Sequence, residues 1–182
     1  ESSDSMVVRP GSRTSVAEQF RALRTNVQFM LPANEKVVLL TSSMSGEGKS
    51  FVALNLAATL ALSGKKVVIM ELDLRKPKIS QALGISSTKG FSNYAIGEAE
   101  IKEIILPTGE QDNFWVIPAG PIPPNPSELI MLPRVQQLFD ELKVHFDYII
   151  MDTAPLGLVA DAQLLAGFAD LTLFLVRQGY TL

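Results

Sequence analysis

The residues best suited to chemistry lie in one short polar segment, residues 43–50, which reads Ser-Met-Ser-Gly-Glu-Gly-Lys-Ser. Two glycines in such a segment allow backbone angles closed to other residues, so several N–H groups can turn toward one anion. Lys49 would bring a full positive charge to the β- and γ-phosphates of a nucleotide, and the hydroxyl group of Ser50 is a ligand for Mg²⁺. We therefore predict a phosphate-binding loop. The residues expected to contact the nucleotide are Ser45, Gly46, Glu47, Gly48, Lys49, Ser50 and Phe51.

The segments on either side of this loop have the order that such a loop requires. The apolar run Val37–Leu40 predicts a buried strand, and the apolar run Phe51–Leu62 predicts a helix. The start of that helix near Lys49 would add unpaired N–H groups and the positive end of the helix dipole. Ser43 stands where the strict pattern G-x-x-x-x-G-K-[ST] has its first glycine, so a Ser/Gly loop without this function stays an alternative.

Three carboxylates follow two other apolar runs. Glu71 and Asp73 come after Val67–Met70, and Asp152 comes after Tyr148–Met151. A buried carboxylate is unfavourable unless it is paired with a cation or faces a cleft, and ligands of open α/β sheets bind at the carboxyl ends of the strands. We expect Asp152 to hold a metal ion, and the two further acids leave one able to accept a proton from a hydroxyl group. A structural role for the acids at the strand ends is the alternative.

Strands and helices alternate along the whole chain. We expect further helices at 15 to about 30, 98–106, 133 to about 145 and 161–168, and further strands at 114–117 and 171–176. Prolines exclude regular structure between residues 118 and 126. This order predicts an α/β fold with a doubly wound, mostly parallel sheet flanked by helices. Residues 1–13 are expected to form a flexible lead-in, and residues 14–182 one domain.

Composition excludes several functions. The chain has 182 residues, of which 47% are hydrophobic, enough for one domain with a core. The net charge of −3 provides no general attraction to nucleic acid. The absence of cysteine excludes disulfides, thiol catalysis and cysteine metal sites, and a single histidine excludes a histidine metal cluster. No apolar run approaches the roughly 20 residues of a membrane span. The chain also begins without methionine, which we interpret as a piece of a longer protein.

The first expected helix carries two side-chain stripes. Ser15 and Glu18 fit a capping box at its start, and an apolar stripe follows. A second stripe contains Glu18, Arg21 and Arg24. Spacing alone favours a helix cap and a solvated face for these three charged residues.

These motifs together resemble the bacterial tyrosine kinases, which are P-loop NTPases and the cytoplasmic autokinase domains of capsule and exopolysaccharide co-polymerases. The resemblance covers residues 12–182. Its parts are an E-x-x-R-x-x-R helix at 18–24, a Walker A segment at 43–50, a Walker A′ segment at 68–77, a proline-rich segment at 118–129 and a Walker B segment at 149–155.

The resemblance implies a protein-tyrosine autokinase that uses ATP and Mg²⁺, modifies tyrosines of a neighbouring subunit and regulates capsule or exopolysaccharide synthesis and export. It assigns catalysis to Lys49, Glu71, Asp73 and Asp152, and metal binding to Ser50, Asp73 and Asp152. Glu71 stands where the family has an aspartate proposed to activate the tyrosine hydroxyl, and its side chain is one methylene longer.

The resemblance also implies partners. Glu18, Arg21 and Arg24 would mediate ring-like self-assembly. Other expected partners are a membrane-spanning activator segment or subunit and the tyrosine-rich C-terminal tail of a neighbouring subunit, but no nucleic acid. The expected location is the cytoplasmic side of the bacterial inner membrane. The tail itself is not part of this chain, whose tyrosines are Tyr94, Tyr148 and Tyr180.

Two other functions stay open from the sequence. A ParA/MinD-type ATPase switch shares this kind of sheet, but that class has a signature lysine early in its phosphate loop, where this chain has Met44. A nucleotide-binding interaction module with weak catalysis is the second alternative, and the glutamate at position 71 keeps it open.

Overall fold

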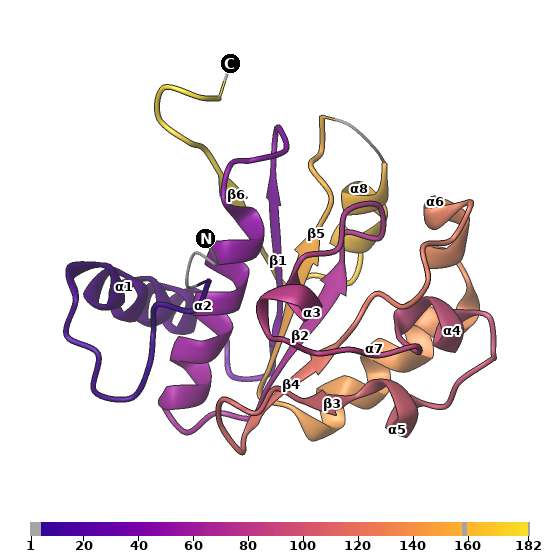
Figure 1. Cartoon of the computed structure of the whole chain (residues 1–182), viewed down its shortest axis with the longest axis horizontal. Helices are drawn as coiled ribbons and strands as arrows, with labels where there is room; N and C mark the ends of the chain where they lie inside the picture. Colours follow the sequence, from indigo (N-terminus) through magenta and orange to yellow (C-terminus); the bar gives the residue numbers. More distant parts are fainter. Residues whose placement is uncertain (1–4, 158–159, 182) are drawn as a thin grey trace.

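A six-stranded, mostly parallel sheet forms the centre of the molecule (Figure 1). The computed structural model describes residues 5–157 and 160–181, and within them the strand order is β3-β4-β2-β5-β1-β6. The strands are β1 Val37–Ser42, β2 Val67–Leu72, β3 Leu106–Pro107, β4 Phe114–Ile117, β5 Tyr148–Thr153 and β6 Leu171–Leu175. The prediction of a doubly wound, mostly parallel α/β fold is confirmed.

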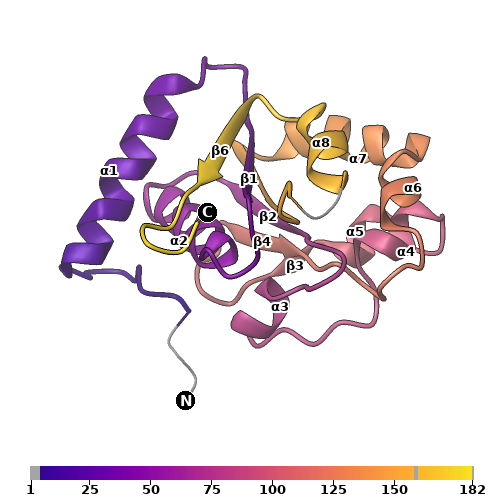
Figure 2. The same cartoon turned by 90° about the horizontal axis from the view of Figure 1, so that it is seen from above.

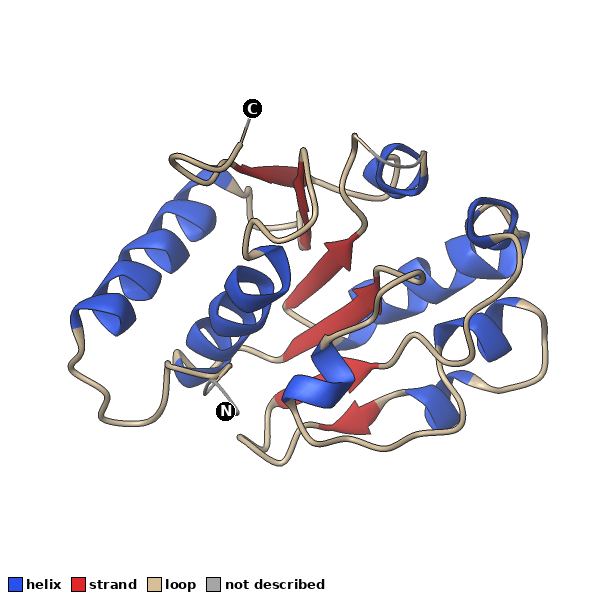
Figure 3. Cartoon of the chain, turned by 45° about the horizontal axis from the view of Figure 1, so that its top comes forward, coloured by secondary structure: helices blue, strands red, loops and turns tan. Residues whose placement is uncertain are grey.

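Helices cover both faces of the sheet (Figures 2 and 3). They are α1 Ser15–Met30, α2 Lys49–Leu62, α3 Ile79–Ala82, α4 Phe91–Ala95, α5 Ile101–Ile104, α6 Pro126–Ile130, α7 Pro133–His145 and α8 Asp161–Ala166. Helices α1, α2 and α3 pack on one face, and α4 to α8 pack on the other. Along β1, Val37 and Leu39 join one core while Val38 and Leu40 join the other, as the two-residue repeat of a strand requires.

The parallel strands have their carboxyl ends on the same side of the sheet, and this brings the polar residues at the strand ends together. Strand β5 lies between β1 and β2, with Asp152 in register with Leu40 on one side and Glu71 on the other. Strand β6 pairs with the opposite side of β1. The segments that follow β1, β2, β5 and β6 therefore leave the sheet at the same edge, where ligands of such folds bind.

The outer strand of the sheet beside β4 differs from the prediction. We expected one helix at 98–106, but α5 is confined to Ile101–Ile104, and Leu106–Pro107 pairs antiparallel with β4. Pro107 accounts for the change, because a residue before proline disfavours the helical region and proline is tolerated on an edge strand. At α1 the cap is Thr14, whose hydroxyl accepts the N–H of Ala17, one residue before the expected Ser15.

Part of the expected lead-in is packed against the domain. Met6 and Val8 are buried, and the N–H groups of Val7 and Val8 donate to the side-chain oxygen of Asn55 in α2. The amide nitrogen of Asn55 in turn donates to the carbonyl oxygen of Ser5. Residues 5–8 are thus held by burial of two apolar side chains and by hydrogen bonds, which differs from the flexible segment that their sequence predicted.

Candidate functional site

The predicted phosphate-binding loop joins the end of β1 to the start of α2. Gly46 and Gly48 have φ of 90° and 92°, a region that residues with a Cβ rarely adopt. Gly48 is also the N-cap of α2 and provides no side chain to the first N–H groups of the helix. The loop therefore presents free amides and the positive end of a helix dipole, which is the arrangement that binds phosphate.

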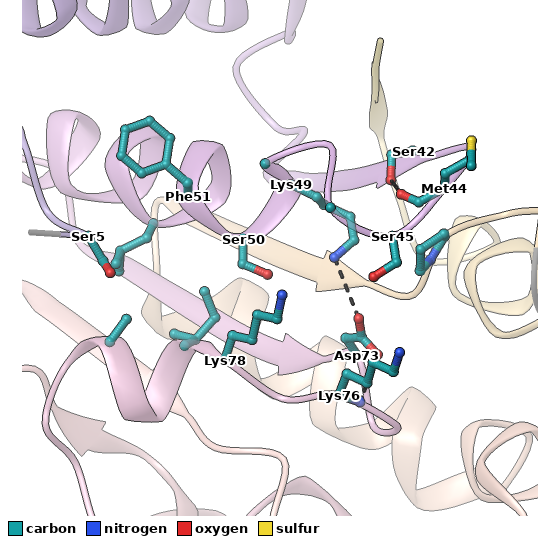
Figure 4. Close-up of a pocket in the computed structure, with 16 residues that line it drawn as sticks. Ser5, Ser42, Met44, Ser45, Lys49, Ser50, Phe51, Asp73, Lys76 and Lys78 are labelled. Carbon is teal, nitrogen blue, oxygen red and sulfur yellow. Dashed lines mark hydrogen bonds and ion pairs between the residues drawn. The ribbon is translucent and has the colours of Figure 1, made fainter. Parts of the chain in front are cut away.

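Lys49 is held between two carboxylates. Its Nζ lies 3.0 Å from Oδ1 of Asp152 and 3.6 Å from Oδ2 of Asp73 (Figure 4 shows the pair with Asp73). All three residues are buried, Asp152 completely. The structure thus brings together three of the four residues predicted for catalysis, from α2, the end of β5 and the segment after β2.

Asp152 has one buried carboxylate oxygen that stands apart from its ion pair with Lys49. Its Oδ2 is buried and has no hydrogen-bond partner within the described part of the chain. Burial raises the pKa of this carboxyl group, while the Lys49 ammonium and the Ser50 hydroxyl oppose the increase. An unsatisfied buried carboxylate oxygen beside a serine hydroxyl fits a bound divalent cation.

The oxygen atoms in this part of the site suit a Mg²⁺ ion that takes only some of its ligands from the protein. No cluster of three histidine or acidic side chains that could hold a metal occurs among the described residues. Mg²⁺ in nucleotide sites is held by one or two protein oxygens together with substrate phosphates and water. Ser50, Asp73 and Asp152 are suited to that role.

Glu71 is the exception among the predicted catalytic residues. Its carboxylate accepts the N–H of Ser80 and the N–H of Ala119, each at 2.9 Å, and also the Ser80 hydroxyl. The side chain is buried, and it lies against a cavity that is formed by α3 and residues 118–120 and not by the phosphate-binding loop. The structure therefore does not bring Glu71 to the phosphate-binding loop, because its carboxylate is occupied in joining α3 to the segment that follows β4.

Glu47 stabilises the phosphate-binding loop through hydrogen bonds to its carboxylate. Its carboxylate accepts the N–H of Met44 at 2.8 Å and the hydroxyl of Thr181. The Thr181 hydroxyl, followed by the Met44 amide, lowers the pKa of Glu47, so the ionised side chain holds the loop closed on itself. Ser45 and Phe51, also predicted to contact nucleotide, line the cavity beside the loop.

The segment after β6 contacts the loop and was not identified from the sequence. Tyr180 donates its hydroxyl hydrogen to the carbonyl oxygen of Ser45 at 3.0 Å, and Arg177 donates to the carbonyl oxygen of Gly46 at 3.0 Å. The Arg177 guanidinium also lies 5.0 Å from the centre of the Tyr180 ring. The available signal was the position of these residues just after a strand that could neighbour β1.

Two lysines in the segment after β2 were also missed. The loop, Asp73 and residues of α3 line a cavity of about 240 Å³, and Lys76 and Lys78 line it too. Their position directly after two strand-end acids was the signal for them.

The predicted self-assembly residues lie on the outer surface of α1. Arg21 donates to Glu18 and to the carbonyl oxygen of Ser12, so the pair is satisfied within the chain. The Glu18 side chain is 62% exposed. Nε of Arg24 is buried without a hydrogen-bond partner among the residues that the structure describes. Of the three side chains, that of Glu18 is exposed to a second protein, while Arg21 and Arg24 are half-buried.

Known proteins and solved structures are similar to this chain over most of its length. The family model described as AAA domain matches residues 35–178. The tyrosine-protein kinase YwqD of Bacillus subtilis strain 168 is 37% identical over 166 residues, which are 91% of this chain and 70% of YwqD. The kinase domain of the Escherichia coli tyrosine kinase ETK is 35% identical with a TM-score of 0.87, and the match covers 91% of this chain and 65% of that domain.

More distant structures share only the fold. The septum site-determining protein MinD of Pyrococcus horikoshii OT3, complexed with Mg-ADP, is 23% identical with a TM-score of 0.66, over 78% of this chain and 57% of that one. The described part of the chain has no helix long and apolar enough to cross a membrane.

Proposed function

This chain belongs to the bacterial tyrosine-protein kinases, within the wider AAA-domain family, and we propose that it transfers the γ-phosphoryl group of ATP to tyrosine hydroxyls of a neighbouring subunit. The single observation that carries the proposal is the position of Lys49. Its ammonium group lies between the carboxylates of Asp73 and Asp152 at the start of α2. Such a site can bind a triphosphate and still keep an acid beside the group that reacts.

Binding would use the loop and the start of α2. The amides of residues 45–50 surround the phosphates, and Lys49 faces the β- and γ-phosphates. Ser50, Asp73 and Asp152 would hold Mg²⁺, which neutralises charge on the phosphates when it is bound. The unsatisfied Oδ2 of Asp152 supports this assignment.

The reaction needs an acceptor for the tyrosine proton. The tyrosine oxygen forms a bond to the γ-phosphorus, the bond from that phosphorus to the β–γ bridging oxygen breaks, and ADP leaves with its electron pair. The family resemblance assigns the proton to Glu71. Asp73 lines the cavity beside the loop and Glu71 does not, so the geometry favours Asp73 as the acceptor.

The wider role is also a proposal. Exposed Glu18, with the half-buried Arg21 and Arg24, would join neighbouring subunits in a ring, so that the tyrosine-rich tail of one subunit reaches the site of the next. A membrane-spanning segment or subunit would activate the domain on the cytoplasmic side of the inner membrane, in capsule or exopolysaccharide synthesis. The match to the tyrosine-protein kinase etk of E. coli K12, 36% identical, spans 91% of this chain and 23% of that protein, which is consistent with a domain of a larger system.

One assay separates the candidate functions. We would incubate the protein with ATP and Mg²⁺, with and without a tyrosine-rich tail peptide, and follow phosphotyrosine and free phosphate. Phosphotyrosine on the peptide or the protein supports the kinase. Free phosphate alone would favour a MinD-type switch, and neither product would favour a binding module. The position of Met44, where the MinD-type class has its signature lysine, weakens the switch.

A further inference from the structure

We propose that Lys76 and Lys78 form a second cationic wall of the nucleotide site and bind the terminal phosphates opposite the phosphate-binding loop. Both lysines line the same cavity as Ser45, Lys49 and Ser50, although they come from the segment between β2 and α3. Figure 4 shows the Lys78 side chain directed toward Ser50, with Lys76 beside Asp73. The inference rests on the proposed nucleotide binding and adds the groups that balance its charge.

The side chains around Lys49 do not balance the charge of a polyphosphate. The ammonium of Lys49 already faces two carboxylates, Asp73 and Asp152, within 3.6 Å. These three side chains together supply no net positive charge for a polyphosphate. Free amides and the helix dipole contribute partial charges only. Beyond the Mg²⁺ that would accompany the nucleotide, further full positive charge at this cavity must therefore come from other side chains.

Lys76 and Lys78 are available for this role. No acidic side chain pairs with either ammonium group among the residues that the structure describes, whereas the adjacent Arg75 is paired with buried Asp161 at 3.3 Å. Both lysines are exposed, so their long side chains can adjust to a ligand.

The backbone that carries these lysines is fixed. The N–H of Lys76 donates to Oδ1 of Asp73 at 3.1 Å, and Pro77 restricts the chain between the two lysines. Ile79, next to Lys78, is completely buried. The two lysine side chains thus extend from a fixed backbone on one side of the cavity. This lowers the conformational entropy that phosphate binding would cost.

The test measures nucleotide affinity by calorimetry for the wild-type protein, Lys76→Met, Lys78→Met and the double variant. We expect Mg-ATP to bind about 5- to 20-fold more weakly to the double variant, because two charge-assisted contacts are lost at a partly screened site. The double variant should lose affinity for inorganic tripolyphosphate with Mg²⁺ to a similar extent, and its affinity for AMP should equal that of the wild-type protein. Lys78→Arg should retain most of the affinity. Lys65→Met is the matched control, because Lys65 is exposed beyond the opposite end of α2.

Three results would overturn the inference. If Lys49→Met loses Mg-ATP while the double variant binds it within about two-fold of the wild type at low salt, the wall does not bind phosphate and the proposed function stands. If the wild-type protein binds no adenine nucleotide, the proposed function and the lysine wall both fail. An equal loss in Lys65→Met would mean that the effect is a general change in protein charge, which also contradicts the inference.

Discussion

The Nζ atom of Lys49 lies 3.0 Å from Oδ1 of Asp152, although the two residues are 103 positions apart in the sequence. One belongs to the first turn of α2 and the other to the end of β5. The pairing of β1 with β5 brings them together, since Leu40 and Asp152 are in register. The ion pair joins the part of the site that would bind phosphate to the part that would bind the metal.

Replacing Lys49 by methionine should weaken Mg-ATP binding and turnover by about ten- to a hundred-fold, because a charged hydrogen bond is worth roughly 1.5–3 kcal/mol. Calorimetry and a phosphotyrosine assay measure the two effects, and circular dichroism checks that the variant is folded. Lys65→Met is the control. Unchanged affinity and turnover in Lys49→Met would refute the assignment of the loop.

Asp152→Asn should change how stability depends on pH. Burial raises the pKa of Asp152 in the folded protein. At pH values between the ordinary aspartate pKa of 3.8 and this raised pKa, the folded state therefore binds more protons than the unfolded state. This group therefore makes the wild-type protein less stable as pH rises through that interval, and asparagine removes the effect. Urea unfolding at several pH values should show the variant gaining stability relative to the wild type as pH rises. Parallel curves would contradict the raised pKa.

Glu71→Ala should act mainly on stability. The change leaves the N–H groups of Ser80 and Ala119 and the Ser80 hydroxyl without their acceptor, which should lower the free energy of unfolding by about 2–4 kcal/mol. Nucleotide affinity of the folded variant should stay within about three-fold of the wild type. Chemical denaturation and calorimetry measure the two quantities. A variant that is as stable as the wild type yet loses phosphotyrosine formation would instead support Glu71 as the proton acceptor.

Arg21→Ala combined with Arg24→Ala should shift the protein toward monomer in sedimentation experiments, if α1 joins neighbouring subunits. Lys102→Ala is a suitable control, because Lys102 is an exposed cation on α5. A wild-type protein that stays monomeric at every concentration would contradict the role of α1 in self-assembly.

Gly46→Ala should destabilise the loop for two separable reasons. The φ of 90° is unfavourable for alanine by about 1–2 kcal/mol, and the added Cβ would lie 2.7 Å from the Tyr180 hydroxyl oxygen. Tyr180→Phe removes that oxygen but leaves the backbone strain. A double-mutant cycle of unfolding free energies should therefore show that Tyr180→Phe recovers part of the loss, with a coupling of about 0.5–1 kcal/mol. Strict additivity would show that the segment after β6 does not contact the loop in solution.

The sequence by itself predicted the phosphate-binding loop, the parallel α/β fold and the presence of acids at the strand ends near that loop. These features depend on local residue order: glycines before a helix, apolar runs that end in carboxylates, and the alternation of strands and helices. The short antiparallel strand at Leu106–Pro107 was missed, because its pairing with β4 is not encoded in those two residues.

The tertiary structure alone decided which side chains meet at the site. Glu71 and Asp73 are two residues apart, but the pairing of β2 with β4 brings the amide of Ala119 to Glu71, while Asp73 faces Lys49. Likewise, the pairing of β6 with β1 places Tyr180 on the phosphate-binding loop. Such contacts depend on strand order and on which segments follow neighbouring strands, and these are set by the packing of segments far apart in the sequence.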